Sequence, residues 1–221
     1  MQSAKSAVFL IHIMLSIILI FTTCKSLTPL ADYQYDVSDI DAVILSDFAV
    51  KTQPDKYSCG VATIAMVYSH LIKDITVTEV QRKLDIEDKK SITQAEFKEY
   101  VSAMLGSGYN VQLKEESGDT ELLQNIYLQL AENIPVPVFF VAPNAYKEGT
   151  YDIHVSAVTG IHPEKETVTI ANAYGFTEEI SINSFLNRMH LRAGDKLPFM
   201  QSLNVRLGAI KENTMFVIKR K

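Results

Sequence analysis

The sequence has few cysteines, no tryptophan and none of the short motifs that hold metals or nucleotides. Two cysteines among 221 residues exclude a disulfide framework of the kind that small secreted domains use. No HExxH motif or paired-cysteine spacing is present, so the sequence offers no metal site. A GxxxxGKS/T loop is also missing, so we expect no nucleotide or other cofactor.

The charged residues exclude a further class of partner. Lys and Arg number 21 and Asp and Glu number 26, which gives a net charge of −5. The basic tail 219–221 is too short to neutralise a run of phosphates, so we do not expect a nucleic acid partner. With 47% hydrophobic and 21% charged residues, the chain has the composition of a globular protein with room for one ordinary domain.

The N-terminal end differs from the rest of the chain. Residues 7 to 23 are uncharged and mostly apolar, and they follow a short, weakly positive start containing Lys5. A run of this length is short for a bilayer-spanning helix, so it indicates an export signal in residues 1–24. Two fates of Cys24 stay open. It resembles the lipidated cysteine of a bacterial lipoprotein signal, although Phe21 stands where Leu is typical, or cleavage occurs a little later.

The chain divides into three predicted parts. Residues 1–24 form the export signal, 25–48 a tether and first strand, and 49–221 the folded domain. We therefore expect an exported protein of the cell envelope, either lipid-anchored to a membrane at Cys24 or secreted.

The stretch Gln53–Leu71, QPDKYSCGVATIAMVYSHL, is the most informative part of the sequence. Cys59 opens an apolar run, which predicts a buried helix with the cysteine at its N-terminus. The free N–H groups and the dipole of a helix N-terminus stabilise a thiolate, the form of cysteine that attacks carbonyl groups. Ser58 is expected to cap this helix, and Gly60 would let a substrate backbone approach the sulfur. The alternative is that Cys59 is a small core residue.

The remaining pattern places helices mainly in the first half and strands mainly in the second. Further helices are predicted from a cap at Thr78 to Leu84, from a Thr93–Glu96 capping box to a stop at Gly106, from Thr120 to Glu132 and from Ser184 to Met189. Strands are predicted at Ala42–Leu45, Tyr109–Leu113, Val136–Ala142, Tyr151–Ile161, Thr167–Ala173 and Thr214–Lys219. This order favours an α+β fold in which a helical lobe packs on an antiparallel sheet.

His154 and Asn172 lie on two successive predicted strands. Asn172 could therefore accept a hydrogen bond from one ring nitrogen of His154 while the other faces Cys59. Gln53 could donate, together with the Cys59 backbone N–H, to the oxygen of a tetrahedral intermediate. Taken singly, each is explained as well by a core or surface position. Their order, Gln, Cys, His, Asn, favours a catalytic set.

These residues carry a resemblance to a known family. Residues 53–71, with His154–Val158 and Thr169–Gly175, resemble the papain-like cysteine peptidases that process double-glycine leader peptides of bacteriocins, in their stand-alone branch. The resemblance covers roughly residues 50–190. Two positions depart from the family pattern: Asn172 stands where many members carry Asp, and Ala173 where many carry Pro. Asn is nevertheless the orienting residue of papain itself.

The resemblance implies a papain-like fold and an exported cysteine peptidase that acts on a peptide or protein. Cys59 would attack the peptide carbonyl, His154 would transfer the proton, Asn172 would hold the ring and Gln53 would stabilise the oxyanion. The same thiol could instead serve an acyltransferase or a deamidase. A catalytically silent papain-like surface binding module is a third alternative. The substrate and the oligomeric state are not determined by the sequence.

Overall fold

The computed structural model describes residues 30–87, 91–193 and 196–221. The export signal 1–24, Cys24 and the first residues of the tether lie outside these ranges, so the expected export, lipid anchoring and cell-envelope location stay predictions. Across the described ranges, no helix combines the length and apolar character needed to cross a membrane.

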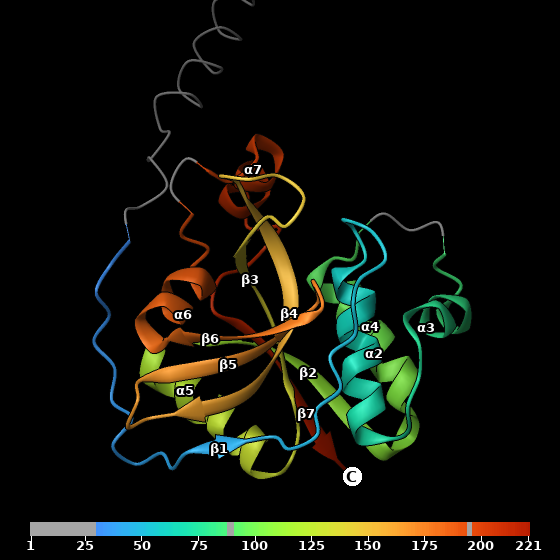
Figure 1. The fold of residues 1–221 in the computed structure, drawn as a ribbon, viewed down its shortest axis with the longest axis horizontal. Helices are drawn as coiled ribbons and strands as arrows, with labels where there is room; N and C mark the ends of the chain where they lie inside the picture. The colour runs from blue at the N-terminus through green and yellow to red at the C-terminus, as the bar shows by residue number, and fades with distance from the viewer. Residues whose placement is uncertain (1–29, 88–90, 194–195) are drawn as a thin grey trace, which may run out of the picture.

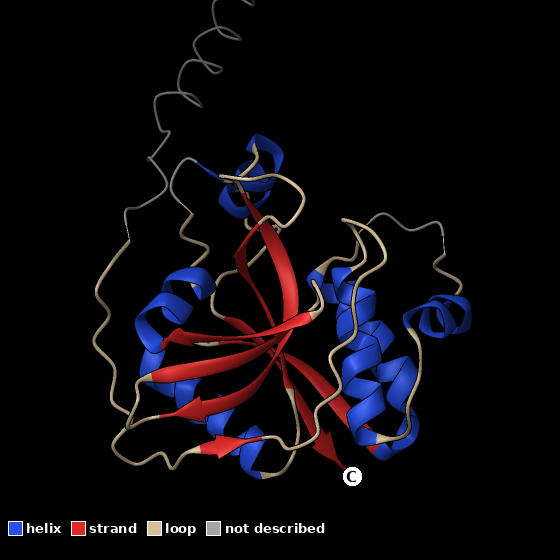
Figure 2. Cartoon of the chain, viewed as in Figure 1, coloured by secondary structure: helices blue, strands red, loops and turns tan. Residues whose placement is uncertain are grey.

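One antiparallel sheet forms the centre of the domain (Figures 1 and 2). The strand order is β2-β7-β3-β4-β5-β6, and β1 pairs with β4 outside this path. The strands are β1 (Val43–Ile44), β2 (Tyr109–Glu115), β3 (Val136–Pro143), β4 (Tyr151–His162), β5 (Thr167–Asn172), β6 (Phe176–Ser181) and β7 (Thr214–Arg220). Each strand predicted from the sequence is therefore present, with small differences at the ends.

Helices cover the sheet on two sides. Figure 1 shows α2, α3 and α4 as a helical lobe on the right, whereas α5 and α6 lie on the left. The helices are α2 (Cys59–Leu71), α3 (Val77–Leu84), α4 (Gln94–Leu105), α5 (Asp119–Ala131), α6 (Ile182–Met189) and α7 (Phe199–Arg206), with a short 3₁₀ helix, η1 (Gly106–Gly108). The cysteine thus begins a helix of the helical lobe, and the histidine lies on the sheet.

Strand β3 shows why the sheet can be covered on both sides. Its apolar run is buried from Val136 to Ala142. Val138 and Phe140 pack into a core with α5 and α6, whereas Phe139 packs into a second core with α2 and α4. Because successive side chains of a strand point to opposite faces, a strand between two helical layers must be apolar at every position.

The predicted caps are partly correct. The Thr93–Glu96 capping box at the start of α4 is present, with hydrogen bonds in both directions. The predicted cap of α3 at Thr78 is wrong, because Thr76 is the N-cap residue. Thr76 forms the reciprocal bonds with Glu79, which lies three residues later as a capping box requires.

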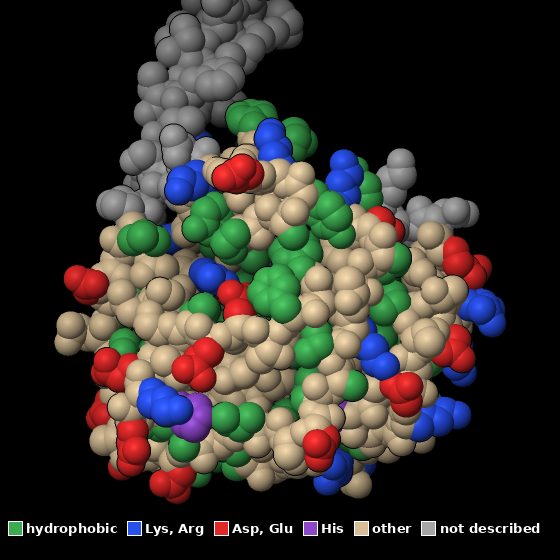
Figure 3. Space-filling view, in the orientation of Figure 1, with side chains coloured by type: hydrophobic (Ala, Val, Ile, Leu, Met, Phe, Trp, Pro, Cys, Tyr) green, Lys and Arg blue, Asp and Glu red, His purple; other side chains and the backbone are tan. Residues whose placement is uncertain are grey.

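Besides the one-turn helix η1, two elements were not predicted. Strand β6, with sequence FTEEIS, is an edge strand with no buried residue, so it lacks a strong apolar signal. Helix α7 buries only Ser202. Its neighbourhood keeps several apolar side chains exposed, namely Phe199, Met200 and Leu207. Figure 3 shows hydrophobic side chains at this upper end of the molecule and through the middle of the visible face, with most acidic and basic side chains toward its edges.

Candidate active site

The loop before α2 sets the position of Cys59. Asp55 organises this loop: its carboxylate accepts hydrogen bonds from the Tyr57 backbone N–H at 2.7 Å and from the Ser58 hydroxyl at 2.7 Å. Ser58 is the N-cap residue, but its side chain makes no capping bond to the helix. The predicted Ser58 side-chain cap is therefore wrong, because Asp55 engages the hydroxyl. The first backbone N–H groups of α2 therefore receive no capping bond from Ser58, and they lie at the helix end where Cys59 stands.

Cys59 is half-buried, and burial and hydrogen bonds shift the pKa of its thiol in opposite directions. Burial raises the pKa of the Cys59 thiol above its ordinary value, and this cause exceeds the opposing hydrogen bonds from the Val155 and Gly60 backbone groups. The helix end alone was expected to supply a thiolate. In the structure, desolvation of the charged sulfur acts against the helix N–H groups, so activation of the thiol by the helix end stays a prediction.

A buried hydroxyl joins the cysteine helix to the histidine strand. Thr63 is fully buried in α2, and its Oγ1 lies 2.9 Å from the Cys59 carbonyl oxygen and 3.0 Å from the Val155 carbonyl oxygen on β4. The backbone hydrogen bond from Val155 to the sulfur lies on the same strand. The structure therefore brings Cys59 against the residue that follows His154.

His154 is buried, and its ring has a defined environment. The ring Nε2 lies 2.9 Å from Asn172 Oδ1, so the predicted His154–Asn172 contact is present. Tyr174 stacks on the imidazole with ring centroids 4.2 Å apart, and Phe140 meets it edge-on at 5.9 Å. Burial lowers the pKa of His154 to about 4, although the Asn172 hydrogen bond acts in the opposite direction.

The amide of Asn172 determines which ring nitrogen is free. Asn172 Nδ2 donates to Glu178 Oε1 at 2.8 Å, and Asn172 Oδ1 also accepts from the Tyr174 backbone N–H at 3.0 Å. The amide oxygen must therefore face His154, and Nε2 of the neutral ring carries the proton. The lone pair of Nδ1 is then available as a base. Among the described side chains, no hydrogen bond joins this imidazole to the Cys59 sulfur, and in enzymes such bonds often shorten only when substrate binds.

Gln53 lies in the same region but is engaged elsewhere. Its backbone N–H donates to the Ala173 carbonyl at 2.7 Å, which holds it beside the strand end that carries Asn172. Its side-chain Nε2 donates to the Asp55 carbonyl at 2.6 Å and to the Tyr146 hydroxyl at 3.4 Å. Both amide hydrogens thus have acceptors, and Oε1 is buried without a partner among the described residues. An oxyanion could take over only the weaker bond, the one to Tyr146.

Several residues of this region were missed by sequence reasoning. Glu178 on β6 forms an ion pair with Arg188 on α6, with distances of 3.1 and 3.0 Å from Arg188 Nη1 to the two carboxylate oxygens. Tyr174 stacks on the histidine, and Thr63 joins the two elements. Only the alternation of side chains in FTEEIS could have indicated a strand there, and no local signal pairs Glu178 with Asn172.

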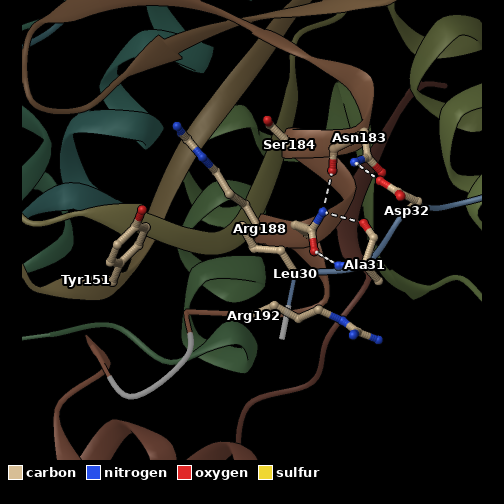
Figure 4. Close-up of a pocket in the computed structure, with 9 residues that line it drawn as sticks. Leu30, Ala31, Asp32, Tyr151, Asn183, Ser184, Arg188 and Arg192 are labelled. Carbon is tan, nitrogen blue, oxygen red and sulfur yellow. Dashed lines mark hydrogen bonds between the residues drawn. The ribbon is translucent and has the colours of Figure 1, made fainter. Parts of the chain in front are cut away.

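Arg188 also lines a cavity of about 330 Å³ next to α6. Figure 4 shows the Arg188 side chain extending from α6, and Tyr151 at the start of β4 on another wall. The chain segment 30–32 closes one side: the Asn187 amide bonds to both the N–H and the carbonyl of Ala31, each at 2.9 Å. Within the part of the chain that is described, no group of three or more His, Cys, Asp or Glu side chains could hold a metal ion.

The comparison with known proteins decides the family. A model of the Peptidase_C39 like family matches residues 45–191. The chain belongs to the Peptidase_C39 like family. The matched range contains Gln53, Cys59, His154 and Asn172. The predicted resemblance to bacteriocin-processing peptidases is confirmed, and the predicted α+β arrangement of a helical lobe on an antiparallel sheet is present.

Solved structures similar to this C39-like protein share little sequence with it. The peptidase domain of Streptococcus ComA, a bi-functional ABC transporter, is 14% identical over 79% of this chain and 99% of its own, with a TM-score of 0.49. A double glycine motif protease from an AMS/PCAT transporter, solved with a leader peptide, is 12% identical over 81% and 99%, at 0.46. A C39-like peptidase from Bacillus anthracis is 11% identical over 82% and 100%, at 0.49. No curated protein matches the chain.

Proposed function

We propose that this C39-like protein is a cysteine peptidase that hydrolyses a peptide bond with Cys59, His154 and Asn172. One observation carries the proposal. The Asn172 amide holds His154 at 2.9 Å in the tautomer whose Nδ1 is a base, on the strand that contacts the Cys59 sulfur through Val155. Membership of the family supports the same reaction class.

The reaction would begin from a neutral pair, because burial raises the pKa of Cys59 and lowers that of His154. As the sulfur attacks the peptide carbonyl carbon, Nδ1 takes the thiol proton. The imidazolium then gives this proton to the leaving amine, the C–N bond breaks, and a thioester remains on Cys59. Water, deprotonated by the same imidazole, attacks the thioester, which releases the carboxylic acid and restores the thiol.

Charge develops on the carbonyl oxygen during both attacks. The Cys59 backbone N–H and the Gln53 amide would donate to this oxygen, and in other enzymes the loss of one such donor costs about 3 kcal/mol. Gln53 can do so after its hydrogen bond to the Tyr146 hydroxyl is replaced by one to the substrate. When a substrate enters, its carbonyl oxygen would therefore replace the Tyr146 hydroxyl as the acceptor for one Gln53 amide hydrogen.

The test compares Cys59→Ala with Cys24→Ala, which removes the other thiol of the chain. Purified protein is incubated with a library of peptides, including peptides that contain Gly-Gly, and the products are identified by mass spectrometry. We expect cleavage, and iodoacetamide labelling located by mass spectrometry at residue 59 itself, to be lost in Cys59→Ala and kept in Cys24→Ala. Turnover that persists in Cys59→Ala would end the proposal. Products that carry a new amide, or Gln side chains converted to Glu, would instead identify an acyltransferase or a deamidase.

A catalytically silent binding module is the second candidate, and two observations favour it. Among the described side chains no hydrogen bond joins His154 to the Cys59 sulfur, and both amide hydrogens of Gln53 already have acceptors. The rate of Cys59 alkylation separates the two functions. In a peptidase His154 is the base that activates the thiol, so His154→Ala should slow the alkylation of Cys59. In a binding module the substitution leaves the rate unchanged.

We also propose that residues 1–24 export the protein to the cell envelope. The mass of the mature N-terminus, measured on protein recovered from a bacterial host, distinguishes a lipidated Cys24 from cleavage beyond it. An intact N-terminus in the cytoplasm would contradict export.

A further inference from the structure

A carboxylate lies behind the residue that orients the histidine. Asn172 ends β5 and Glu178 lies on the neighbouring β6, where Asn172 is paired with Phe176. Glu178 is two residues beyond Phe176, so the Asn172 and Glu178 side chains lie on the same face of the sheet. The resulting bond from Asn172 Nδ2 to Glu178 Oε1 measures 2.8 Å.

Arg188 holds this carboxylate in place from the other side. Its Nη1 lies 3.1 and 3.0 Å from the two oxygens of Glu178, and both side chains are mostly buried, with 17% and 18% of their surfaces exposed. A partly buried ion pair with two short contacts restricts both side chains more than a solvated pair does. The chain Arg188, Glu178, Asn172, His154 is thus continuous, and each link joins a donor to an acceptor.

The chemistry of each link restricts the residue at position 172. An ionised carboxylate only accepts hydrogen bonds, so the group that faces Glu178 must donate. His154 Nε2 carries a proton when Nδ1 is the base, so the group that faces it must accept. An amide does both at once, with Nδ2 toward Glu178 and Oδ1 toward His154. An aspartate would satisfy His154 but would face Glu178 with a second negative charge.

We propose that Glu178 is a positioning residue that fixes the Asn172 amide toward His154, and that the Glu178–Arg188 pair makes this peptidase depend on asparagine rather than aspartate at position 172. This proposal rests on the proposed function. It assigns a role to β6 and α6, both of which lie within the range 45–191 that the family model matches.

The experiment is a double-mutant cycle between positions 172 and 178. Asn172→Asp brings two carboxylates together, and we expect kcat/KM to fall about 10- to 100-fold, the range for loss of a hydrogen bond to a charged group. Adding Glu178→Gln supplies an amide that donates to the new carboxylate, so the double variant should regain most of the activity. Glu179→Gln, an exposed position on the same strand, is the matched control and should leave kcat/KM unchanged.

A second measurement does not depend on turnover. The Nε2 proton of His154, observed by NMR, should show a weakened hydrogen-bonded signal in Glu178→Ala, in which only the Tyr174 backbone N–H still orients the Asn172 amide. The signal should be stronger in the double variant than in Asn172→Asp. Urea unfolding of every variant excludes loss of the fold as the cause. A double variant no better than Asn172→Asp, or a Glu178→Ala protein identical to the parent, would overturn the positioning role. If no variant hydrolyses peptide but the NMR signals behave as expected, the peptidase proposal fails and the positioning role stands.

Discussion

The strongest test of the site is the charge of His154, because the mechanism begins from a neutral imidazole. Burial is the largest cause that lowers the pKa of His154 from 6.5 to about 4, and the nearby Arg188 charge acts in the same direction. In the unfolded chain the ring takes up a proton near its ordinary value, whereas in the folded protein it does so only near pH 4.

The consequence for stability follows from proton uptake. Between the two pKa values the unfolded chain binds more protons than the folded protein, so the free energy of unfolding rises with pH across this window. The stability contribution of His154 is fully present above pH 6.5 and is lost as the pH falls toward 4. Since one pKa unit corresponds to about 1.4 kcal/mol, the loss amounts to about 3 kcal/mol.

Urea unfolding at pH 7, 5.5 and 4 measures this loss. The parent and His154→Gln share all other titrating groups, so the difference between their unfolding free energies isolates the histidine. We expect the advantage of the parent over the variant to shrink by about 3 kcal/mol between pH 7 and pH 4.

NMR titration of the His154 ring gives the pKa directly. The midpoint should lie near pH 4 and should stay there in Cys59→Ala, because burial rather than the thiol causes the shift. A midpoint at or above 6.5 that falls in Cys59→Ala would refute the reasoning. It would show a thiolate–imidazolium pair, in which the helix end outweighs desolvation after all.

Two further substitutions test how the site is held together. Thr63→Val removes the hydroxyl that contacts the Cys59 and Val155 carbonyl oxygens. Urea unfolding should show a free energy of unfolding lower by about 1–3 kcal/mol. An unchanged value would mean that the hydroxyl does not join α2 to β4. Gly175→Ala should lower the free energy of unfolding by at least about 1–3 kcal/mol in the same assay. Gly175 has φ +99°, and an added Cβ would lie 2.3 Å from Thr52 Oγ1. Gly118→Ala, which meets nothing within 4 Å, is its control, and equal losses in the two variants would contradict the steric explanation.

Features set by neighbours along the chain could be predicted from the sequence. The Thr93–Glu96 capping box was predicted because it uses groups three residues apart. The apolar run of β3 was predicted because burial on both faces requires it. The apolar run after Cys59 was sufficient to place it at a helix end, and the strand patterns placed His154 and Asn172 on adjacent strands.

The tertiary structure decided what depends on distant segments meeting. Whether the Cys59 sulfur is charged depends on how much of it the fold buries. The neighbouring residues in the sequence do not predict how this burial compares with the hydrogen bonds to the sulfur. The amide of Gln53 has both hydrogens occupied because Tyr146, 93 residues later, comes to it across the fold. Glu178 reaches Asn172 only because an edge strand without buried residues pairs with β5. Local sequence thus determined the elements and the reactive groups, and packing determined their protonation, orientation and partners.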